Sequence, residues 1–230
     1  MSSATAHAAP AGDPHADGSL AHHFESHAQQ NQAATLGMWA FLVQEVMFFG
    51  GLFTVYLVYR TLHPLAFTEG SAHLPRDLGT LNTAVLIGSS LTMALAVRCG
   101  QLAQGKRAAL LIVATMALAG VFLGVKAVEY GHKWDDQLVP GLRWAPGPEA
   151  DPHLNLFYAL YFVMTGCHAL HMLVGLVLMV FVARKAWRGG YSRVNHLGLE
   201  CLGLYWHFVD LVWIFLFPLL YLLHGAGAHP

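Results

Sequence analysis

Five long apolar stretches, separated by short polar segments, dominate this chain of 230 residues. They lie at about 35–60, 79–101, 108–130, 155–184 and 197–223. Roughly 20 apolar residues in a helix cross the hydrocarbon core of a bilayer, so each stretch is long enough to span a membrane. Pro75 and Pro152 precede the second and fourth stretches, as is usual near helix starts. The pattern predicts an all-α, polytopic membrane protein, a bundle of five transmembrane helices over residues 35–223 without a second domain.

The remaining segments are polar or rich in helix breakers. Residues 1–34 contain Ala, His and Ser but no Lys or Arg, and they are expected to form a disordered cytoplasmic tail. Its histidines could alternatively bind a transition metal weakly. Residues 131–154 hold several prolines and glycines and are expected to be an ordered loop at most. Residues 224–230 would form a short outer tail.

Composition agrees with a membrane location. Hydrophobic residues make up 56% of the chain and charged residues 11%, compared with about 25% charged residues in soluble domains. The formal net charge of −1 gives no support for a nucleic-acid partner. The sequence shows no nucleophile with a matched base, no phosphate loop and no dinucleotide fingerprint. Neither a catalytic centre nor a directly bound soluble substrate is therefore expected in this chain.

The distribution of basic residues predicts the orientation. The connections after the second and fourth stretches carry seven Lys and Arg residues, whereas those after the first and third carry four. Positively charged loops favour the cytoplasmic side. We therefore expect a cytoplasmic N-terminus and a C-terminus on the outer side of the membrane.

Glu45 lies within an otherwise uncharged run from Thr35 to Tyr59. An ionised carboxylate near the middle of a transmembrane helix costs at least about 2.5 kcal/mol, so Glu45 must be neutral, paired or directed at protein. One interpretation is an interior carboxyl that hydrogen-bonds a neighbouring helix. The other is a proton-linked or regulatory site, and position alone supports both equally.

Two polar stripes follow the fourth and fifth stretches at helical spacing. The spacings of three and four put each set on one helical face, so neither can face lipid. The titratable members of the two stripes are His168 and His171 on the fourth stretch and Glu200, His207 and Asp210 on the fifth. The simplest arrangement pairs the imidazoles with the carboxylates across the helix interface, as a buried polar network. His207 and Asp210 could also pair within their own helix.

Metal or haem ligation is the alternative for these histidines. A membrane haem usually needs histidines from opposed helices, and His168 with His207 could supply them. The structural network is the preferred interpretation, because a buried histidine more often satisfies a neighbouring group than a cofactor. No metal site is therefore assigned to this chain.

Two further charged pairs lie near the ends of the stretches. Lys126 and Glu129 are three residues apart at the outer end of the third stretch, where a local ion pair or snorkelling would account for them. Lys185 and Arg188 lie at the cytoplasmic end of the fourth stretch. They are candidates for binding an anionic lipid headgroup, although the positive-inside effect accounts for them equally well.

Five co-linear motifs between about residue 30 and residue 223 resemble subunit III of the haem–copper cytochrome c oxidases. The motifs include Gln44-Glu-Val-Met-Phe-Phe-Gly-Gly, Lys126-Ala-Val-Glu-Tyr, Thr165-Gly-Cys-His-Ala-Leu-His and Tyr205-Trp-His-Phe-Val-Asp. The chain is similar to the five-span bacterial form, which lacks the first helix pair of the seven-span form.

The resemblance implies an accessory role in an aa3-type oxidase that reduces oxygen to water and translocates protons. In this family, haem and copper are bound by partner subunits and not by subunit III. Subunit III packs directly against subunit I, assembles with subunit II and in some complexes with subunit IV, and binds phospholipid. It stabilises subunit I and supports proton uptake and oxygen access. Glu45 matches the carbodiimide-reactive glutamate of the family, and Lys185 and Arg188 match basic residues near a lipid headgroup.

Several other functions stay open at this stage. Within the family, the chain could serve a quinol oxidase or a system associated with a nitric-oxide reductase. From other classes, it could be an autonomous cytochrome b or a proton transporter. A haem absorbance of the isolated chain would favour the cytochrome, and proton flux without partners would favour the transporter.

Overall fold

The computed structural model of the chain describes residues 27–148, 150–191 and 196–222. Five of its helices are long and apolar enough to cross a membrane, which confirms the predicted multi-pass, all-α architecture. They are α1 (His27–Leu62), α3 (Arg76–Gln101), α4 (Gly105–Asp135), α5 (Leu154–Trp187) and α6 (Leu197–Tyr221). The predicted tail of residues 1–26, the loop at 192–195 and the end at 223–230 lie outside the described residues.

The helices extend beyond the apolar stretches that predicted them. Residues 27–34, expected in the N-terminal tail, are helical, and α4 continues five residues past the expected end at 130. Hydropathy reports the part of a helix that lies in hydrocarbon, whereas backbone hydrogen bonding continues into the polar interface. The second stretch was expected to begin at 79 with Pro75 before it, and α3 begins directly after Pro75.

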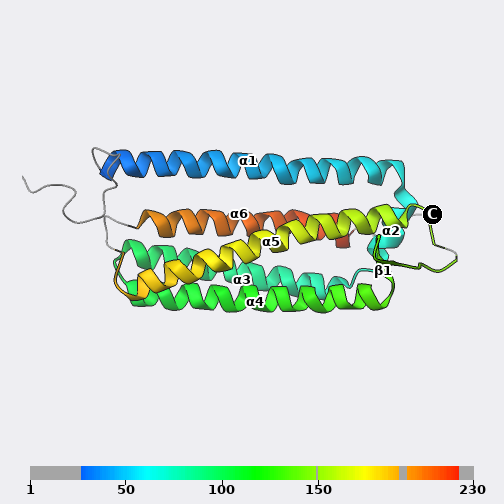
Figure 1. The fold of residues 1–230 in the computed structure, drawn as a ribbon. Helices are drawn as coiled ribbons and strands as arrows, with labels where there is room; N and C mark the ends of the chain where they lie inside the picture. The colour runs from blue at the N-terminus through cyan, green and yellow to red at the C-terminus, as the bar shows by residue number, and fades with distance from the viewer. Residues whose placement is uncertain (1–26, 149, 192–195, 223–230) are drawn as a thin grey trace, which may run out of the picture. The chain divides into compact units, whose positions relative to one another are not determined.

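The chain divides into two units, residues 1–41 and residues 42–230. In the first unit, the described residues 27–41 form the N-terminal part of α1. In the second unit, α3, α4, α5 and α6 pack in a ring in which each helix contacts the next and α6 returns to α3 (Figure 1). This four-helix ring buries several large aromatic side chains, among them Trp206 and Trp213.

Residues 42–62 of α1 reach the rest of the second unit through long side chains. Phe49 and Tyr56 are buried, while many of their neighbours on the same helix are exposed. The Tyr56 hydroxyl donates to the backbone carbonyl of Leu219 on α6 at 2.7 Å. Phe49 and Tyr56 thus anchor the C-terminal half of α1 at two positions along the helix.

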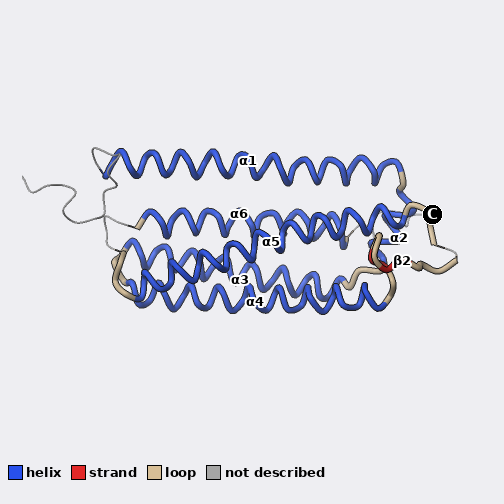
Figure 2. The backbone as a smooth tube through the Cα atoms, in the orientation of Figure 1, coloured by secondary structure: helices blue, strands red, loops and turns tan. Residues whose placement is uncertain are grey.

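Two small elements at one end of the bundle were not predicted (Figure 2). The short helix α2 (Pro64–Ala72) packs against α5, and its Pro64 suits the first turn of a helix. Strands β1 (Leu138–Val139) and β2 (Arg143–Trp144) form an antiparallel hairpin within the segment expected to be a loop. Gly141 lies in its turn at a φ of 74°, a conformation that glycine adopts without strain. Both elements are too short for a hydropathy pattern to reveal them.

One close helix approach shapes the interior. A Cβ atom at Gly175 of α5 would lie 2.9 Å from the Trp206 ring of α6. Glycine at this position therefore lets the indole pack directly against the α5 backbone.

Candidate functional site

Glu45 is buried in the second unit and bonded to a histidine. Its carboxyl oxygen lies 3.0 Å from Nε2 of His171 on α5, and the side chains of both residues are largely shielded. The Phe49 ring packs edge-on against the same imidazole, with centroids 5.1 Å apart. The structure therefore joins Glu45 to a neighbouring helix, the first of the two interpretations offered by its sequence position.

The second bond of His171 defines where a proton must be. Nδ1 of His171 lies 2.7 Å from the backbone carbonyl of Cys167, and a carbonyl can only accept. Nδ1 must therefore carry hydrogen. A neutral His171 then has its lone pair on Nε2, so the bond to Glu45 requires a protonated carboxyl; a carboxylate would instead require a charged imidazolium. In either state, Glu45 and His171 share one proton.

The predicted pairing of the histidines of α5 with the carboxylates of α6 is not found. His171 bonds Glu45 of α1, whereas the polar residues of α6 turn toward α3. Nδ1 of His207 lies 2.7 Å from the Ser90 hydroxyl, and Nε2 of Gln101 donates to Glu200 at 2.7 Å. The helical spacing identified residues that share a face, but the rotation of α6 directs that face to α3 rather than to α5.

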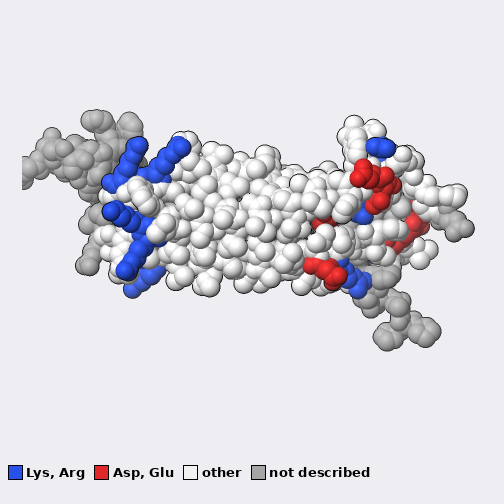
Figure 3. All heavy atoms as spheres, turned by 90° about the horizontal axis from the view of Figure 1, so that it is seen from below, with Lys and Arg blue, Asp and Glu red and all other residues white. Residues whose placement is uncertain are grey.

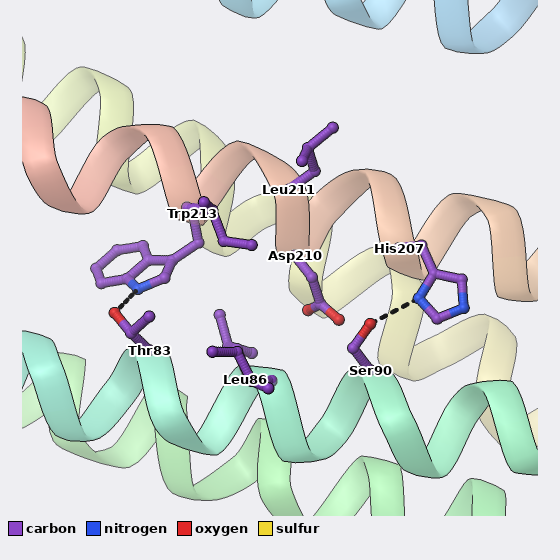
Figure 4. A pocket seen from close by; sticks show the side chains of 9 residues that line it. Thr83, Leu86, Ser90, His207, Asp210, Leu211 and Trp213 are labelled. Atoms are coloured by element: carbon purple, nitrogen blue, oxygen red, sulfur yellow. Dashed lines mark hydrogen bonds between the residues drawn. The ribbon is translucent and has the colours of Figure 1, made fainter.

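Asp210 lies at the centre of α6 without a hydrogen-bond partner of its own. It is 4% exposed, and neither carboxyl oxygen is in hydrogen-bonding geometry with a described group. The carboxyl points into a cavity of about 300 Å³ between α3 and α6, beside the pair formed by Ser90 and His207 (Figure 4). The predicted pair of Asp210 with His207 is therefore not formed.

His168 occupies a different environment from the other histidines. It is 1% exposed and packs between the rings of Phe122 and Trp213, at centroid distances of 5.6 and 5.4 Å. It lines a cavity of about 170 Å³, separate from the one that His207 lines. His168 and His207, the two histidines that the haem hypothesis would use, therefore line different cavities. Within the described ranges, no three His, Cys, Asp or Glu side chains converge to hold a metal ion.

Lys126 and Glu129 form the core of a buried cluster. Nζ of Lys126 lies 3.2 Å from Oε1 of Glu129, and both residues are at most 5% exposed. The same oxygen accepts from the hydroxyls of Tyr161 at 2.6 Å and Tyr221 at 2.5 Å. Lys126 also donates to both hydroxyls. The snorkelling explanation is wrong here, because α5 and α6 each supply a tyrosine that covers the pair.

The charged residues separate between the two ends of the second unit (Figure 3). One end carries the described basic residues Arg98, Lys106, Arg107, Arg184, Lys185 and Arg188. The opposite end carries most of the acidic side chains, several of them on α2 and at the end of α4. Lys185 and Arg188 are exposed, and the ammonium of Lys185 lies 4.9 Å from the centre of the Tyr191 ring.

Sequence reasoning missed the hydroxyl and amide groups that complete these sites. Ser90, Gln101, Tyr161 and Tyr221 each bond one of the predicted polar residues. Ser90 gave a usable signal, because it stands with Ser89 and Thr92 in an otherwise apolar run. The tyrosines gave none, since tyrosine is common at membrane interfaces whether or not it hydrogen-bonds a buried charge.

The chain has extensive similarity to known proteins. A family model described as cytochrome c oxidase subunit III matches residues 150–225. The chain is 40% identical over 191 residues to cytochrome c oxidase subunit 3 of Synechocystis sp., covering 81% of this chain and 74% of the relative. It is 37% identical over 198 residues to that of Thermostichus vulcanus, covering 82% and 86%. Identity to cytochrome bo(3) ubiquinol oxidase subunit 3 of Pseudomonas aeruginosa is 27% over 202 residues, covering 87% and 90%. With most of both chains aligned to these relatives, the chain belongs to the cytochrome c oxidase subunit III family.

Proposed function

We propose that this chain is the accessory, non-redox subunit III of a proton-pumping, aa3-type cytochrome c oxidase that reduces oxygen to water. It packs directly against subunit I and has subunit II and, where present, subunit IV as further neighbours. Haem and copper belong to subunits I and II. It stabilises subunit I and supports proton uptake and access of lipid and oxygen. The relatives named cytochrome c oxidase subunit 3 support this assignment. The structural observation that carries it is the bond between Glu45 and His171.

The Glu45–His171 pair suits a supporting role in proton chemistry. The pair holds one proton in either of two arrangements, carboxyl with imidazole or carboxylate with imidazolium. Moving the proton between Oε2 and Nε2 needs no rearrangement of the chain, because the two atoms are 3.0 Å apart. A pair of this kind can buffer a proton near the middle of the bilayer without taking part in electron transfer.

The outer faces of the helices suit contact with lipid and partner helices. Side chains such as Met47, Leu170 and Phe181 are more than half exposed and apolar. Lys185 and Arg188 at the basic end would face the phosphate of an anionic phospholipid. The same end would lie in the cytoplasm and the acidic end outside, as the positive-inside rule favours.

The orientation can be tested with single cysteines in place of Arg188 and Asp136. In intact cells, a thiol reagent that cannot cross membranes should label Asp136→Cys and leave Arg188→Cys unlabelled until the membrane is permeabilised. The opposite result would contradict the orientation but leave the family assignment untouched.

The accessory role is tested by Glu45→Gln in the whole oxidase. The variant should assemble and still oxidise its electron donor, with a lower proton yield or a faster loss of activity during turnover. Met47→Leu on the exposed side of α1 is the matched control and should behave like the unaltered complex. Loss of all electron transfer to the haem groups in Glu45→Gln would contradict the proposal, because it would give Glu45 a redox role.

A quinol oxidase is the second candidate, favoured by the alignment to the Pseudomonas ubiquinol oxidase subunit over 87% of this chain. The electron donor is determined by the partner subunits. The complex that co-purifies with this chain in mild detergent should be reduced by cytochrome c if the first proposal holds. Reduction only by quinol would select the second.

A further inference from the structure

The cavity between α3 and α6 contains an unpartnered carboxyl near the middle of the membrane. Asp210 is the fourteenth of 25 residues in α6 and is 4% exposed. Its two oxygens meet no described group in hydrogen-bonding geometry, and the Ser90 hydroxyl lies beside the carboxyl (Figure 4). A buried polar group without a partner in the protein usually has a bound water or ion.

The lining of the cavity determines which form of Asp210 is stable. His207 is the only other titratable residue that lines it, and no Lys or Arg does so. Thr83 already accepts from the Trp213 indole at 3.1 Å and donates to a backbone carbonyl, so it is occupied. An ionised Asp210 with no cation beside it would be strongly unfavourable here. A protonated Asp210 whose O–H donates to a hydrogen-bond acceptor carries no such cost.

Ser90 supplies a route from Asp210 to His207. Its hydroxyl lies 2.7 Å from Nδ1 of a neutral His207, to which it donates when the imidazole carries its hydrogen on Nε2. The lone pairs of the Ser90 oxygen then remain available to a donor on the side of Asp210. Figure 4 shows the three side chains in this order, with Ser90 between the carboxyl and the ring.

The cavity has room for the missing link. Its volume is about 300 Å³, and a water molecule occupies about 30 Å³ in the liquid. A water beside Asp210 would accept from the hydroxyl of the carboxylic acid and donate to Ser90, so the acid proton and the Ser90 oxygen would each have a partner. Leu86, Ile87 and Ile214 close the remaining walls with apolar surface.

We propose that this cavity is a proton-binding site in which Asp210 is a protonated carboxylic acid linked to His207 through a bound water and the Ser90 hydroxyl. Proton transfer breaks the O–H bond of Asp210 and forms one on the water. The water passes a proton to Ser90, and Ser90 passes its own to Nδ1 of His207. The result is a carboxylate and an imidazolium, with no other reactant. This site is distinct from the pair of Glu45 and His171, and it does not depend on which oxidase the chain serves.

Infrared spectroscopy of the intact complex in membranes tests the proposal. The spectrum of the wild-type complex minus that of the Asp210→Asn complex should show, at neutral pH, the carbonyl stretching band of a protonated carboxyl. Ser90→Ala should keep that band but move it to higher frequency, because the carboxyl loses the hydrogen-bonded chain beyond the water. If Asp210→Asn removes no such band, Asp210 is ionised and the proposal is overturned.

A hydrophobic carbodiimide gives a second test that needs no substitution. The reagent takes the acid proton onto its nitrogen while the carboxyl oxygen bonds its central carbon, so only a protonated carboxyl reacts. Mass spectrometry of peptides from the treated wild-type complex should find the adduct on Asp210. Glu129 is equally buried but lies beside Lys126, so it should stay unmodified. Absence of the Asp210 adduct, or equal modification of Glu129, would overturn the proposal.

Discussion

Removing one charge from the cluster of Lys126, Glu129, Tyr161 and Tyr221 should destabilise this protein strongly. Lys126 is 5% and Glu129 is 1% exposed, so neither charge can be compensated by water. Breaking a buried ion pair by removing one partner costs about 3–5 kcal/mol, because it leaves the other charge buried and unpaired. We therefore expect Lys126→Met and Glu129→Met each to lower the free energy of unfolding by about 3 kcal/mol or more.

The double variant should be far less damaging than the two single variants together. Lys126→Met with Glu129→Met leaves no buried charge, and the remaining loss comes from two tyrosine hydroxyls without their acceptor, about 1 kcal/mol each. The two substitutions should thus show an interaction free energy of at least about 2 kcal/mol. If Lys126 and Glu129 were instead a surface pair, each single variant would lose only about 0–1 kcal/mol of unfolding free energy, and the two losses would be nearly additive.

Titration of the purified complex with a denaturing detergent, followed by the fluorescence of the interior tryptophans, measures these differences. Arg98→Met is the matched control, since Arg98 is exposed and its side chain bonds Gln101 at 3.3 Å, at the long end of the hydrogen-bond range. It should change the free energy of unfolding by less than about 0.5 kcal/mol. Additive losses below about 1 kcal/mol in the Lys126 and Glu129 variants would refute the account of a closed, buried cluster.

Three further substitutions test separate contacts in the same titration. Tyr56→Phe removes the 2.7 Å bond to the Leu219 carbonyl and should cost about 1 kcal/mol; an unchanged stability would mean that α1 is not anchored there. Gly175→Ala places a Cβ 2.9 Å from Trp206 and should cost about 1–3 kcal/mol, whereas Gly166→Ala meets nothing within 4 Å and should be tolerated. His171→Leu leaves the Glu45 carboxyl buried without its partner and should cost about 1–3 kcal/mol, and a neutral effect would argue against the shared proton.

The sequence was sufficient to predict the five spans because hydropathy is a local property. Each apolar stretch must be helical in lipid, whatever its neighbours are. The small elements α2 and the β1–β2 hairpin were not predictable in this way. They lie at one end of the bundle and pack against α5 and α4.

The partners of the polar residues were not predictable from spacing. The face shared by Glu200, His207 and Asp210 was identified correctly, but it meets Ser90 and Gln101 of α3 rather than the histidines of α5. Spacing fixes which residues lie on one side of a helix, whereas packing of whole helices fixes which neighbour covers that side. The polar residues in α3 were the feature of the sequence that could have indicated α3 as the helix covering this face.

The tyrosines around Lys126 illustrate the same limit. Tyr161 and Tyr221 come from helices that are distant in sequence, and they turn an apparently local pair into a buried cluster. The sequence distance from Lys126 is 35 residues for Tyr161 and 95 for Tyr221. Only the ring of four helices brings the three segments together.

The central claim is that the ionisable groups of this chain serve packing and proton binding, while electron transfer belongs to partner subunits. The most direct test is to purify the oxidase in mild detergent, dissociate this chain from it, and measure haem absorbance and copper in both fractions. The account predicts that haem and copper stay wholly with the partner subunits, which still oxidise the donor. Haem absorbance or stoichiometric copper in the fraction of this chain would contradict it.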